Sequence, residues 1–367
     1  MPHGNAIRLF VAVFLVGLAA LLLFEQPRRP AGDVAEDRFG WTPNPAGVER
    51  FLAELPQPMF REAGAETIRE ARGVDTFLYR SAVRAHAARY GKPWVCGRQG
   101  IGDCVSWGWM HGIWIAQSVD WETGRLAEPP LMPDTTAIYG GSRVESRNKP
   151  GDGASPVGGW SDGSYGAAAA RWVRDWGVVY REPFPDLGYD LTTYSAERAK
   201  AWGAYGAGGQ GDKGRLDKLA KKHPAAHIAM VTTWEEACAA IEAGFPIPVA
   251  SNVGFQSVTD EHGYAVAGPT WNHEMCFCAV RYQKNGSPED ALLCLNSWGS
   301  RWLTYKGKFP ADQPDGSFWV SRKTVERMLA QRDSFCVGSV QGFGWRELDN
   351  GGFLQPAPPE PVAGEAR

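Results

Sequence analysis

The sequence changes character at Gln99-Gly100-Ile101-Gly102-Asp103-Cys104, where a polar, glycine-rich turn meets an apolar stretch that runs from Val105 to about Asp120. The apolar stretch predicts a buried helix that begins at the cysteine. A thiol at a helix N-terminus feels the partial positive charge of unpaired backbone N–H groups, which lowers its pKa. The backbone N–H of Cys104 and the side-chain amide of Gln99 are candidate donors to a developing oxyanion. On its own, the segment also fits a buried, unreactive cysteine.

A histidine stands at the start of a second apolar stretch, Trp271-Asn272-His273-Glu274-Met275-Cys276-Phe277-Cys278-Ala279-Val280. A nucleophilic thiol needs a base that can take its proton, and imidazole titrates in the right range. The other histidines lie in the leader, beside a glycine-rich insertion or within helical runs. His262, in a loop, is the one serious competitor to His273 for the role of base.

An asparagine follows a third apolar run, Ala291–Leu295, in the tetrapeptide Asn296-Ser297-Trp298-Gly299. Its amide can accept a hydrogen bond from one imidazole nitrogen and so aim the other nitrogen at the thiol. An adjacent indole can shield that bond from water and strengthen it. Alone, the four residues also fit a turn.

Taken in order, these segments resemble the papain-like cysteine peptidases, in which Gln, Cys, His and Asn follow one another along the chain. Asn296-Ser297-Trp298-Gly299 matches that family's asparagine motif letter for letter. Three further segments look like supporting elements of the same family: a helix and "G-x-P" strand, a glycine-rich cleft wall and a closing strand, at Glu235–Pro248, Asp162–Gly166 and Gly316–Val320.

The resemblance covers about residues 92–345 and implies an α+β, papain-like fold of two lobes. The helical lobe, about 92–223, would carry the cysteine and the glutamine. The strand-rich, barrel-like lobe, about 224–345, would carry the histidine and the asparagine. The expected catalytic residues are therefore Cys104, His273, Asn296 and Gln99.

Several features depart from the family pattern. Cys104 follows Gln99 by five positions, one fewer than usual, and Val105 stands where the family has Trp. An ionised Asp103 would oppose thiolate formation if its carboxylate pointed inward. His273 lies 169 positions after Cys104, against about 130–150 in papain-type enzymes. These departures indicate a divergent branch of the kind found in bacteria and their phages.

The resemblance implies a cysteine-type peptidase that hydrolyses peptide bonds through a thioester. Two alternatives stay open: a papain-fold amidase or transpeptidase acting on cell-wall peptides, and a non-catalytic papain-fold module. We expect a peptide or protein partner, with no metal and no organic cofactor. The net charge of −3 gives no basic face of the kind that nucleic acid requires.

The amino terminus contains 16 residues without a charge, from Leu9 to Phe24. At 1.5 Å per residue this run reaches about 24 Å, somewhat less than a hydrocarbon core of about 30 Å. We interpret residues 1–26 as an uncleaved signal anchor, with a cleaved signal peptide or a buried helix as alternatives. The interpretation implies a membrane-anchored protein whose catalytic domain is extracytoplasmic.

The remaining segments predict a linker, helices, strands and a tail. Residues 27–91 read as a linker and helical lead-in, or a pro-segment, and residues 346–367 as a Pro-rich disordered tail. Residues 198–222 lack periodicity and are expected to form an exposed loop. Gly108 and Gly112, one helical turn apart, predict close packing by another backbone or a ring. Helices are expected at 165–176 and 233–243, and strands at 247–253, 275–282, 291–295 and 317–321.

The chain has seven cysteines, an odd number that leaves at least one thiol outside any intramolecular disulfide. No pair has the spacing of a structural zinc site. The cysteines therefore do not decide the redox compartment.

Overall fold

The computed structural model describes residues 39–145, 161–223, 227–338 and 346. The predicted anchor at residues 1–26 and nearly all of the predicted tail lie outside this range. Within the described residues, no helix has the length and apolarity needed to cross a bilayer.

The central element is helix α6 (Cys104–Glu122), which is buried almost all round, as its apolar sequence predicts. The two glycines on this helix permit close packing. A Cβ on Gly108 would stand 2.8 Å from the carbonyl oxygen of Met275, and one on Gly112 would stand 2.8 Å from the ring of Pro248. The predicted approach of a backbone and a ring is confirmed.

Strand β8 (His273–Arg281) is the core of a five-stranded antiparallel sheet. One of its edges pairs with β9 (Ala291–Leu295), which in turn pairs with β10 (Phe318–Ser321). The other edge pairs first with β5 (Ile247–Ser251) and then with β1 (Thr76–Phe77). All nine residues of β8 are buried, which explains the apolar run from Met275 to Val280 within it.

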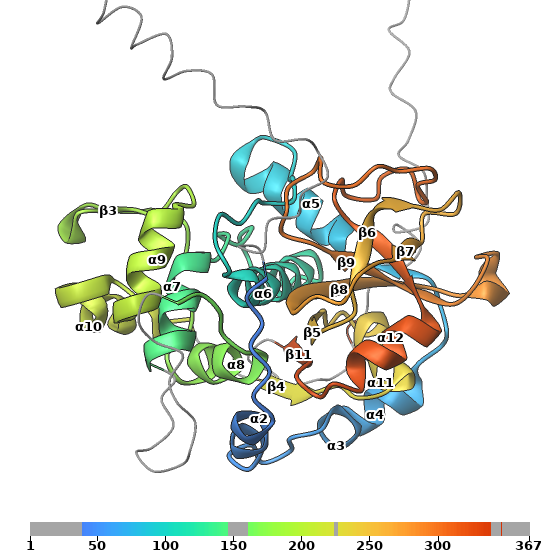
Figure 1. The fold of residues 1–367 in the computed structure, drawn as a ribbon, viewed down its shortest axis with the longest axis horizontal. Helices are drawn as coiled ribbons and strands as arrows, with labels where there is room; N and C mark the ends of the chain where they lie inside the picture. Colours follow the sequence, from blue (N-terminus) through green and yellow to red (C-terminus); the bar gives the residue numbers. More distant parts are fainter. Residues whose placement is uncertain (1–38, 146–160, 224–226, 339–345, 347–367) are drawn as a thin grey trace, which may run out of the picture. The chain divides into compact units, whose positions relative to one another are not determined.

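Helices gather on the other side of α6 from this sheet (Figure 1). They are α7 (Thr135–Gly140), α8 (Gly166–Asp175), α9 (Ala196–Tyr205) and α10 (Gly209–Ala220), with a π-helical turn at Gly141–Glu145. With the sheet opposite, they give the α+β, two-lobed architecture that the sequence predicts.

The expectation of an exposed loop at 198–222 is wrong, because this stretch contains most of α9 and all of α10. Ser195 caps α9 by accepting a hydrogen bond from the Arg198 N–H. Trp202 on α9 and Leu216 on α10 are buried. The helical periodicity was hard to recognise because glycines and lysines are frequent in this stretch. A short helix such as α9 also needs only a few apolar residues to pack on α7.

The lead-in to the central helix is part of the same folded unit. It forms α2 (Pro45–Leu52), α3 (Phe60–Ala63), α4 (Ala65–Glu70), β1 and α5 (Tyr79–Tyr90). Because β1 pairs with β8 and α5 packs on α6, residues 76–90 contribute to the core. Whether any earlier part is removed as a pro-segment stays a prediction.

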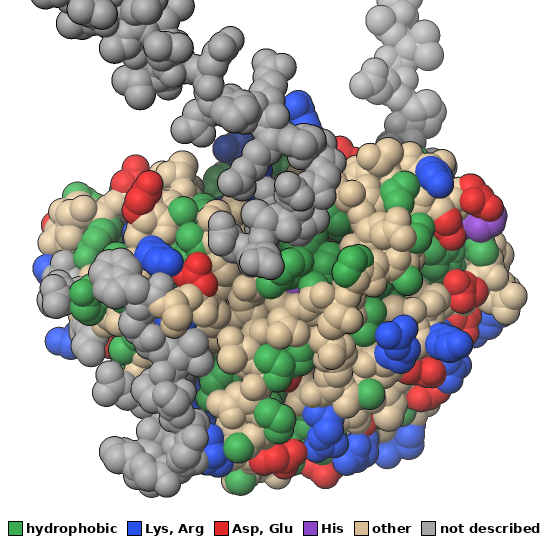
Figure 2. All heavy atoms as spheres, viewed as in Figure 1, with side chains coloured by type: hydrophobic (Ala, Val, Ile, Leu, Met, Phe, Trp, Pro, Cys, Tyr) green, Lys and Arg blue, Asp and Glu red, His purple; other side chains and the backbone are tan. Residues whose placement is uncertain are grey.

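The predicted capping box is confirmed at α11 (Trp234–Glu242), where Thr233 and Glu236 satisfy each other's backbone N–H groups. The other elements are α12 (Arg322–Leu329), the 3-10 turns Pro185–Leu187 and Gln283–Asn285, and the pairs β2 (Pro183–Phe184) with β3 (Tyr189–Asp190), β4 (His227–Met230) with β11 (Phe335–Gly338), and β6 (Phe255–Thr259) with β7 (Ala265–Ala267). On the face shown in Figure 2, Lys and Arg side chains lie among Asp and Glu side chains.

Candidate active site

Cys104 is the first residue of α6, and its side chain is fully buried. Because it opens the helix, its backbone N–H has no partner within the helix. The backbone N–H of Glu274 donates to the sulfur at 3.4 Å. The thiol therefore lies against the first residues of β8, next to His273 in sequence.

His273 and Asn296 form a direct hydrogen bond, with 2.8 Å between Nε2 and Oδ1. Oδ1 also accepts from the backbone N–H of Ser297 at 2.7 Å, which fixes the orientation of the amide. Nε2 must then carry the ring proton, which leaves the lone pair on Nδ1. Nδ1 is buried and has no hydrogen-bond partner in the described part of the chain. The imidazole can therefore accept a proton at Nδ1.

Aromatic rings cover this histidine. The indole of Trp298 lies 4.7 Å from the imidazole between centroids, tilted by 36°. Phe39 meets the imidazole edge-on at 6.1 Å and contacts Trp298 at 5.7 Å. This cover excludes water from the bond between His273 and Asn296, as the sequence predicts for an adjacent indole.

Gln99 is buried and is tied to the segment that carries the asparagine. The hydroxyl of Ser297 donates to Gln99 Oε1 at 2.5 Å, and the Gln99 backbone N–H donates to the Ser297 carbonyl at 2.8 Å. Gln99 Nε2 donates one hydrogen bond to the carbonyl of Ile101 at 2.9 Å. The Ser297 hydroxyl thereby determines which way the Gln99 amide faces.

His262, the competitor for the role of base, lies elsewhere. It is exposed in the turn between β6 and β7, and its backbone N–H donates to Asp260 Oδ1 at 2.9 Å. Of the four residues expected from the sequence, His273 and Asn296 are hydrogen-bonded, Gln99 is bonded to Ser297 next to that asparagine, and Cys104 contacts Glu274 next to that histidine.

A further segment, which the sequence did not predict as part of the site, lies over it. It comprises residues 39–42, and we call it the cover segment. The backbone N–H of Trp41 donates to the Asn272 carbonyl at 3.3 Å. Ser164 donates through its N–H to the Gly40 carbonyl at 2.8 Å and accepts from the Thr42 N–H at 2.7 Å. The segment therefore bridges the strand-rich side, at Asn272, and the helical side, at Ser164.

Gly40 is the closest point of the cover segment to the cysteine turn. A Cβ on this residue would stand 1.8 Å from the carbonyl oxygen of Gly102. Its backbone amide faces the Cys104 sulfur and, like that of Glu274, favours the thiolate. Only glycine fits here, and the sole hint in the sequence is a glycine between two aromatic residues, Phe39 and Trp41, inside a presumed linker.

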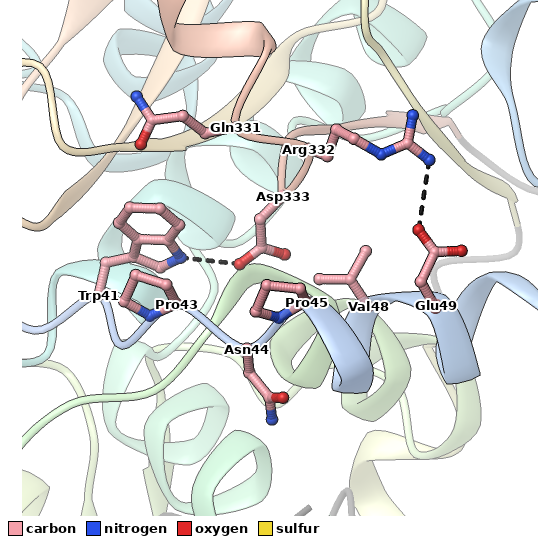
Figure 3. A pocket seen from close by; sticks show the side chains of 9 residues that line it. All are labelled: Trp41, Pro43, Asn44, Pro45, Val48, Glu49, Gln331, Arg332 and Asp333. Carbon is pink, nitrogen blue, oxygen red and sulfur yellow. Dashed lines mark hydrogen bonds and ion pairs between the residues drawn. The ribbon is translucent and has the colours of Figure 1, made fainter.

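Trp41 anchors the cover segment at its far end. Its indole N–H donates to Asp333 Oδ2 at 2.8 Å, beside a pocket of about 160 Å³ that Pro43, Pro45 and Arg332 help to line (Figure 3). Asp333 also accepts hydrogen bonds from the N–H groups of the first two residues of α8. Three donors thus hold this buried carboxyl in place.

The covered site holds the sulfur and the imidazole as neutral groups. Burial raises the pKa of the Cys104 thiol to about 12 and outweighs the opposing effect of the Glu274 and Gly40 amides. Burial also lowers the pKa of His273 to about 4, against the raising effect of Asn296. The expected low thiol pKa is therefore wrong for the covered state, because desolvation exceeds the helix effect.

No protein-family model and no curated protein sequence matches the chain. Among solved structures, the fold is similar to that of xylellain, a cysteine protease from Xylella fastidiosa. The likeness has a TM-score of 0.51 at 14% identity and covers 83% of this chain and 97% of that one. The fold is papain-like.

Two other solved structures align more loosely. One is proCathepsin B S9 from Trypanosoma congolense, with a TM-score of 0.47 at 11% identity, covering 83% of this chain and 87% of that one. The other is digestive procathepsin L 3 from the larval midgut of Tenebrio molitor, with a TM-score of 0.45 at 15% identity, covering 79% of each chain.

Proposed function

We propose that this protein is a cysteine peptidase that hydrolyses peptide bonds, with Cys104 as nucleophile and His273 as base. One observation carries the proposal: the bond from His273 Nε2 to Asn296 leaves a lone pair on Nδ1, and the Cys104 sulfur contacts the backbone N–H of Glu274, the residue that follows this histidine. The description of xylellain as a cysteine protease agrees with this function.

In the proposed reaction, His273 Nδ1 takes the proton of the Cys104 thiol while the sulfur attacks the carbonyl carbon of the scissile bond. The carbonyl electron pair moves onto oxygen, and the Cys104 N–H and the Gln99 amide stabilise that oxyanion. When the oxyanion collapses, the carbon–nitrogen bond breaks and the imidazolium protonates the leaving amine. The products of this step are a thioester and a free amine.

Water completes the cycle. His273 takes a proton from water as the oxygen attacks the thioester carbon, and collapse expels the Cys104 sulfur, which recovers the proton. Asn296 touches no substrate in this scheme. It is a positioning residue, because it holds the imidazole in the tautomer that both steps require.

The cover segment must leave before a substrate can enter, because Cys104 is fully buried beneath it. We therefore propose that the full chain rests in a self-inhibited state. The backbone bonds of the cover segment to Asn272 and Ser164 use groups from both sides of the site, so a peptide cannot bond to these groups while the segment is in place.

The membrane anchor remains part of the proposal. Its support is the charge-free run Leu9–Phe24 followed by a Pro-rich linker. Fractionation of the full chain and of a chain lacking residues 1–26 tests it. Full-length protein in the soluble fraction, or aggregation of the truncated chain, would contradict an anchor.

The peptidase proposal is tested with a quenched fluorescent peptide library. The full chain is compared with Gly40→Ala, in which the clash with Gly102 displaces the cover segment, and each is compared with its Cys104→Ala counterpart. We expect hydrolysis that requires Cys104. If Cys104 accepts a thiol-alkylating reagent but no peptide is cleaved, the proposal is wrong, and hydrolysis of peptidoglycan fragments would then indicate a cell-wall amidase.

A further inference from the structure

Tyr194 joins two points of the turn that precedes the cysteine. Its hydroxyl accepts a hydrogen bond from the backbone N–H of Gly100 at 3.1 Å and donates one to Asp103 Oδ2 at 3.0 Å. Gly100 follows Gln99 and Asp103 precedes Cys104, so the two bonds span the stretch between the two proposed oxyanion donors.

We propose that Tyr194 and Asp103 are positioning residues that hold the oxyanion-binding turn in its working geometry. The proposal rests on the peptidase function argued above, because it concerns donors that act only in that reaction. It also gives a role to the loop before α9, on the helical side of α6 (Figure 1).

The carboxyl group of Asp103 is not needed to start the helix. Asp103 is the N-cap residue of α6, yet its side chain makes no capping hydrogen bond. It is fully buried and bonds instead to Tyr194. A buried carboxyl that does not cap its helix destabilises the fold unless it is satisfied elsewhere. Here Tyr194 satisfies Oδ2, and the Trp107 side chain also favours the ionised form of the carboxyl.

Tyr194 is itself held rigidly enough to act as a support. Its ring packs edge-to-face on Trp107 of α6 with 5.2 Å between centroids. A Cβ on Gly100 would stand 2.8 Å from the Cβ of Ala196, the first residue of α9. The turn therefore packs against the first residue of α9 and is hydrogen-bonded to Tyr194, two residues before that helix.

Burial raises the pKa of Asp103 to about 8. Near neutral pH its carboxyl is then largely uncharged, and it does not oppose a thiolate at the neighbouring Cys104 in the way an ionised group would. This agrees with a role in shape rather than in charge.

The test separates oxyanion stabilisation from thiol reactivity. Tyr194→Phe keeps the ring and removes both hydrogen bonds, and Tyr189→Phe is the matched control, since its hydroxyl donates to the Gly208 carbonyl away from the turn. Both are made in the Gly40→Ala chain. Three quantities are measured: kcat and KM on a cleaved peptide, the affinity for a peptide aldehyde, and the rate of Cys104 alkylation by iodoacetamide.

A peptide aldehyde adds the thiol to give a tetrahedral adduct whose oxygen occupies the oxyanion position, whereas alkylation by iodoacetamide forms no oxyanion. For Tyr194→Phe we expect kcat and aldehyde affinity to fall together by about tenfold. KM and the alkylation rate should stay within about twofold, and Tyr189→Phe should match the parent.

Substitutions of Asp103 test the same inference independently of Tyr194. Asp103→Asn keeps an oxygen that accepts from Tyr194 and should retain most activity, whereas Asp103→Ala should resemble Tyr194→Phe. Combining Asp103→Ala with Tyr194→Phe should cost little more than either change alone. Unchanged kcat and aldehyde affinity in Tyr194→Phe, or an equal fall in alkylation, would overturn the inference. If the peptidase proposal itself were wrong, the parent Gly40→Ala chain would cleave no peptide, and this would be seen before any Tyr194 or Asp103 variant is compared.

Discussion

The Asn296 side-chain oxygen accepts two hydrogen bonds, from His273 Nε2 at 2.8 Å and from the Ser297 backbone N–H at 2.7 Å. The second bond matters because it prevents the amide from turning its NH2 group toward the imidazole. The orientation of the histidine therefore depends on a backbone group that a side-chain substitution at Ser297 would not remove.

Asn296→Ala should lower kcat by roughly 10- to 100-fold, since a buried imidazole N–H left without its acceptor costs about 1–3 kcal/mol. Peptide hydrolysis by the Gly40→Ala chain measures the effect. His273→Ala should abolish turnover, because nucleophile and base act as one unit. His262→Ala, at the exposed histidine, should leave kcat unchanged. A larger loss from His262→Ala than from His273→Ala would reverse the assignment of the base.

Gly40→Ala should speed alkylation of Cys104 by about tenfold or more. Displacing the cover segment breaks two or three backbone hydrogen bonds of about 1 kcal/mol each, and this loss raises the population of the open site by at least that factor. Peptide mapping after iodoacetamide treatment identifies the alkylated cysteine and measures its rate. The other six cysteines are also buried, and their labelling reports any global opening.

Gly91→Ala is the matched control for this substitution. Gly91 has a φ of +65° and no atom within 4 Å of its Cβ position, so alanine introduces strain of about 1 kcal/mol there without a clash. If Gly91→Ala accelerates alkylation of Cys104 as much as Gly40→Ala does, general destabilisation explains the result and the cover segment does not protect the thiol.

Gln99→Ala should lower kcat by about 10²–10³-fold, the usual loss on removing one oxyanion donor. Ser297→Ala leaves the donor present but removes the hydroxyl that orients it, so kcat should fall by a smaller factor of about tenfold. Aldehyde affinity should follow kcat in both variants. An effect of Gln99→Ala below about threefold would mean that Gln99 is structural.

The parts of the fold that the sequence could predict are those whose periodicity is strong. The apolar stretch after Cys104 and the apolar run Met275–Val280 in β8 belong to elements that are almost entirely buried, and their patterns leave few alternatives. Gln99, His273 and Asn296 could be chosen because each stands at the edge of such an element. The helices α9 and α10 were missed because the apolar residues of α9 are mostly alanines, and α10 has three glycines and few large apolar residues.

The cover segment could not be predicted in the same way. Its bonds are made by backbone groups of Gly40, Trp41 and Thr42, which carry no sequence signal. The partner of Trp41, Asp333, lies 292 residues away along the chain. The direction of the Cys104 pKa shift was missed as well, since a helix N-terminus alone would lower the pKa, whereas burial of the thiol raises it.

The pH dependence of alkylation follows from the neutral pair in the covered state. With a thiol pKa of about 12 and a His273 pKa of about 4, the full chain holds very little thiolate at pH 7. Its alkylation rate should therefore keep rising between pH 7 and 10 without reaching a plateau. Opening the site removes the desolvation that disfavours both charged forms, so the thiol pKa falls and the imidazole pKa rises.

In Gly40→Ala the rise in alkylation rate should consequently begin at a lower pH and level off near neutrality, where a thiolate and an imidazolium coexist. Initial rates with iodoacetamide from pH 5 to 10 on both chains give the two profiles. Adding His273→Ala to Gly40→Ala should return the onset toward alkaline pH, because the thiolate then loses its cationic partner. If Gly40→Ala and the full chain show the same onset, the cover segment does not control ionisation of the thiol.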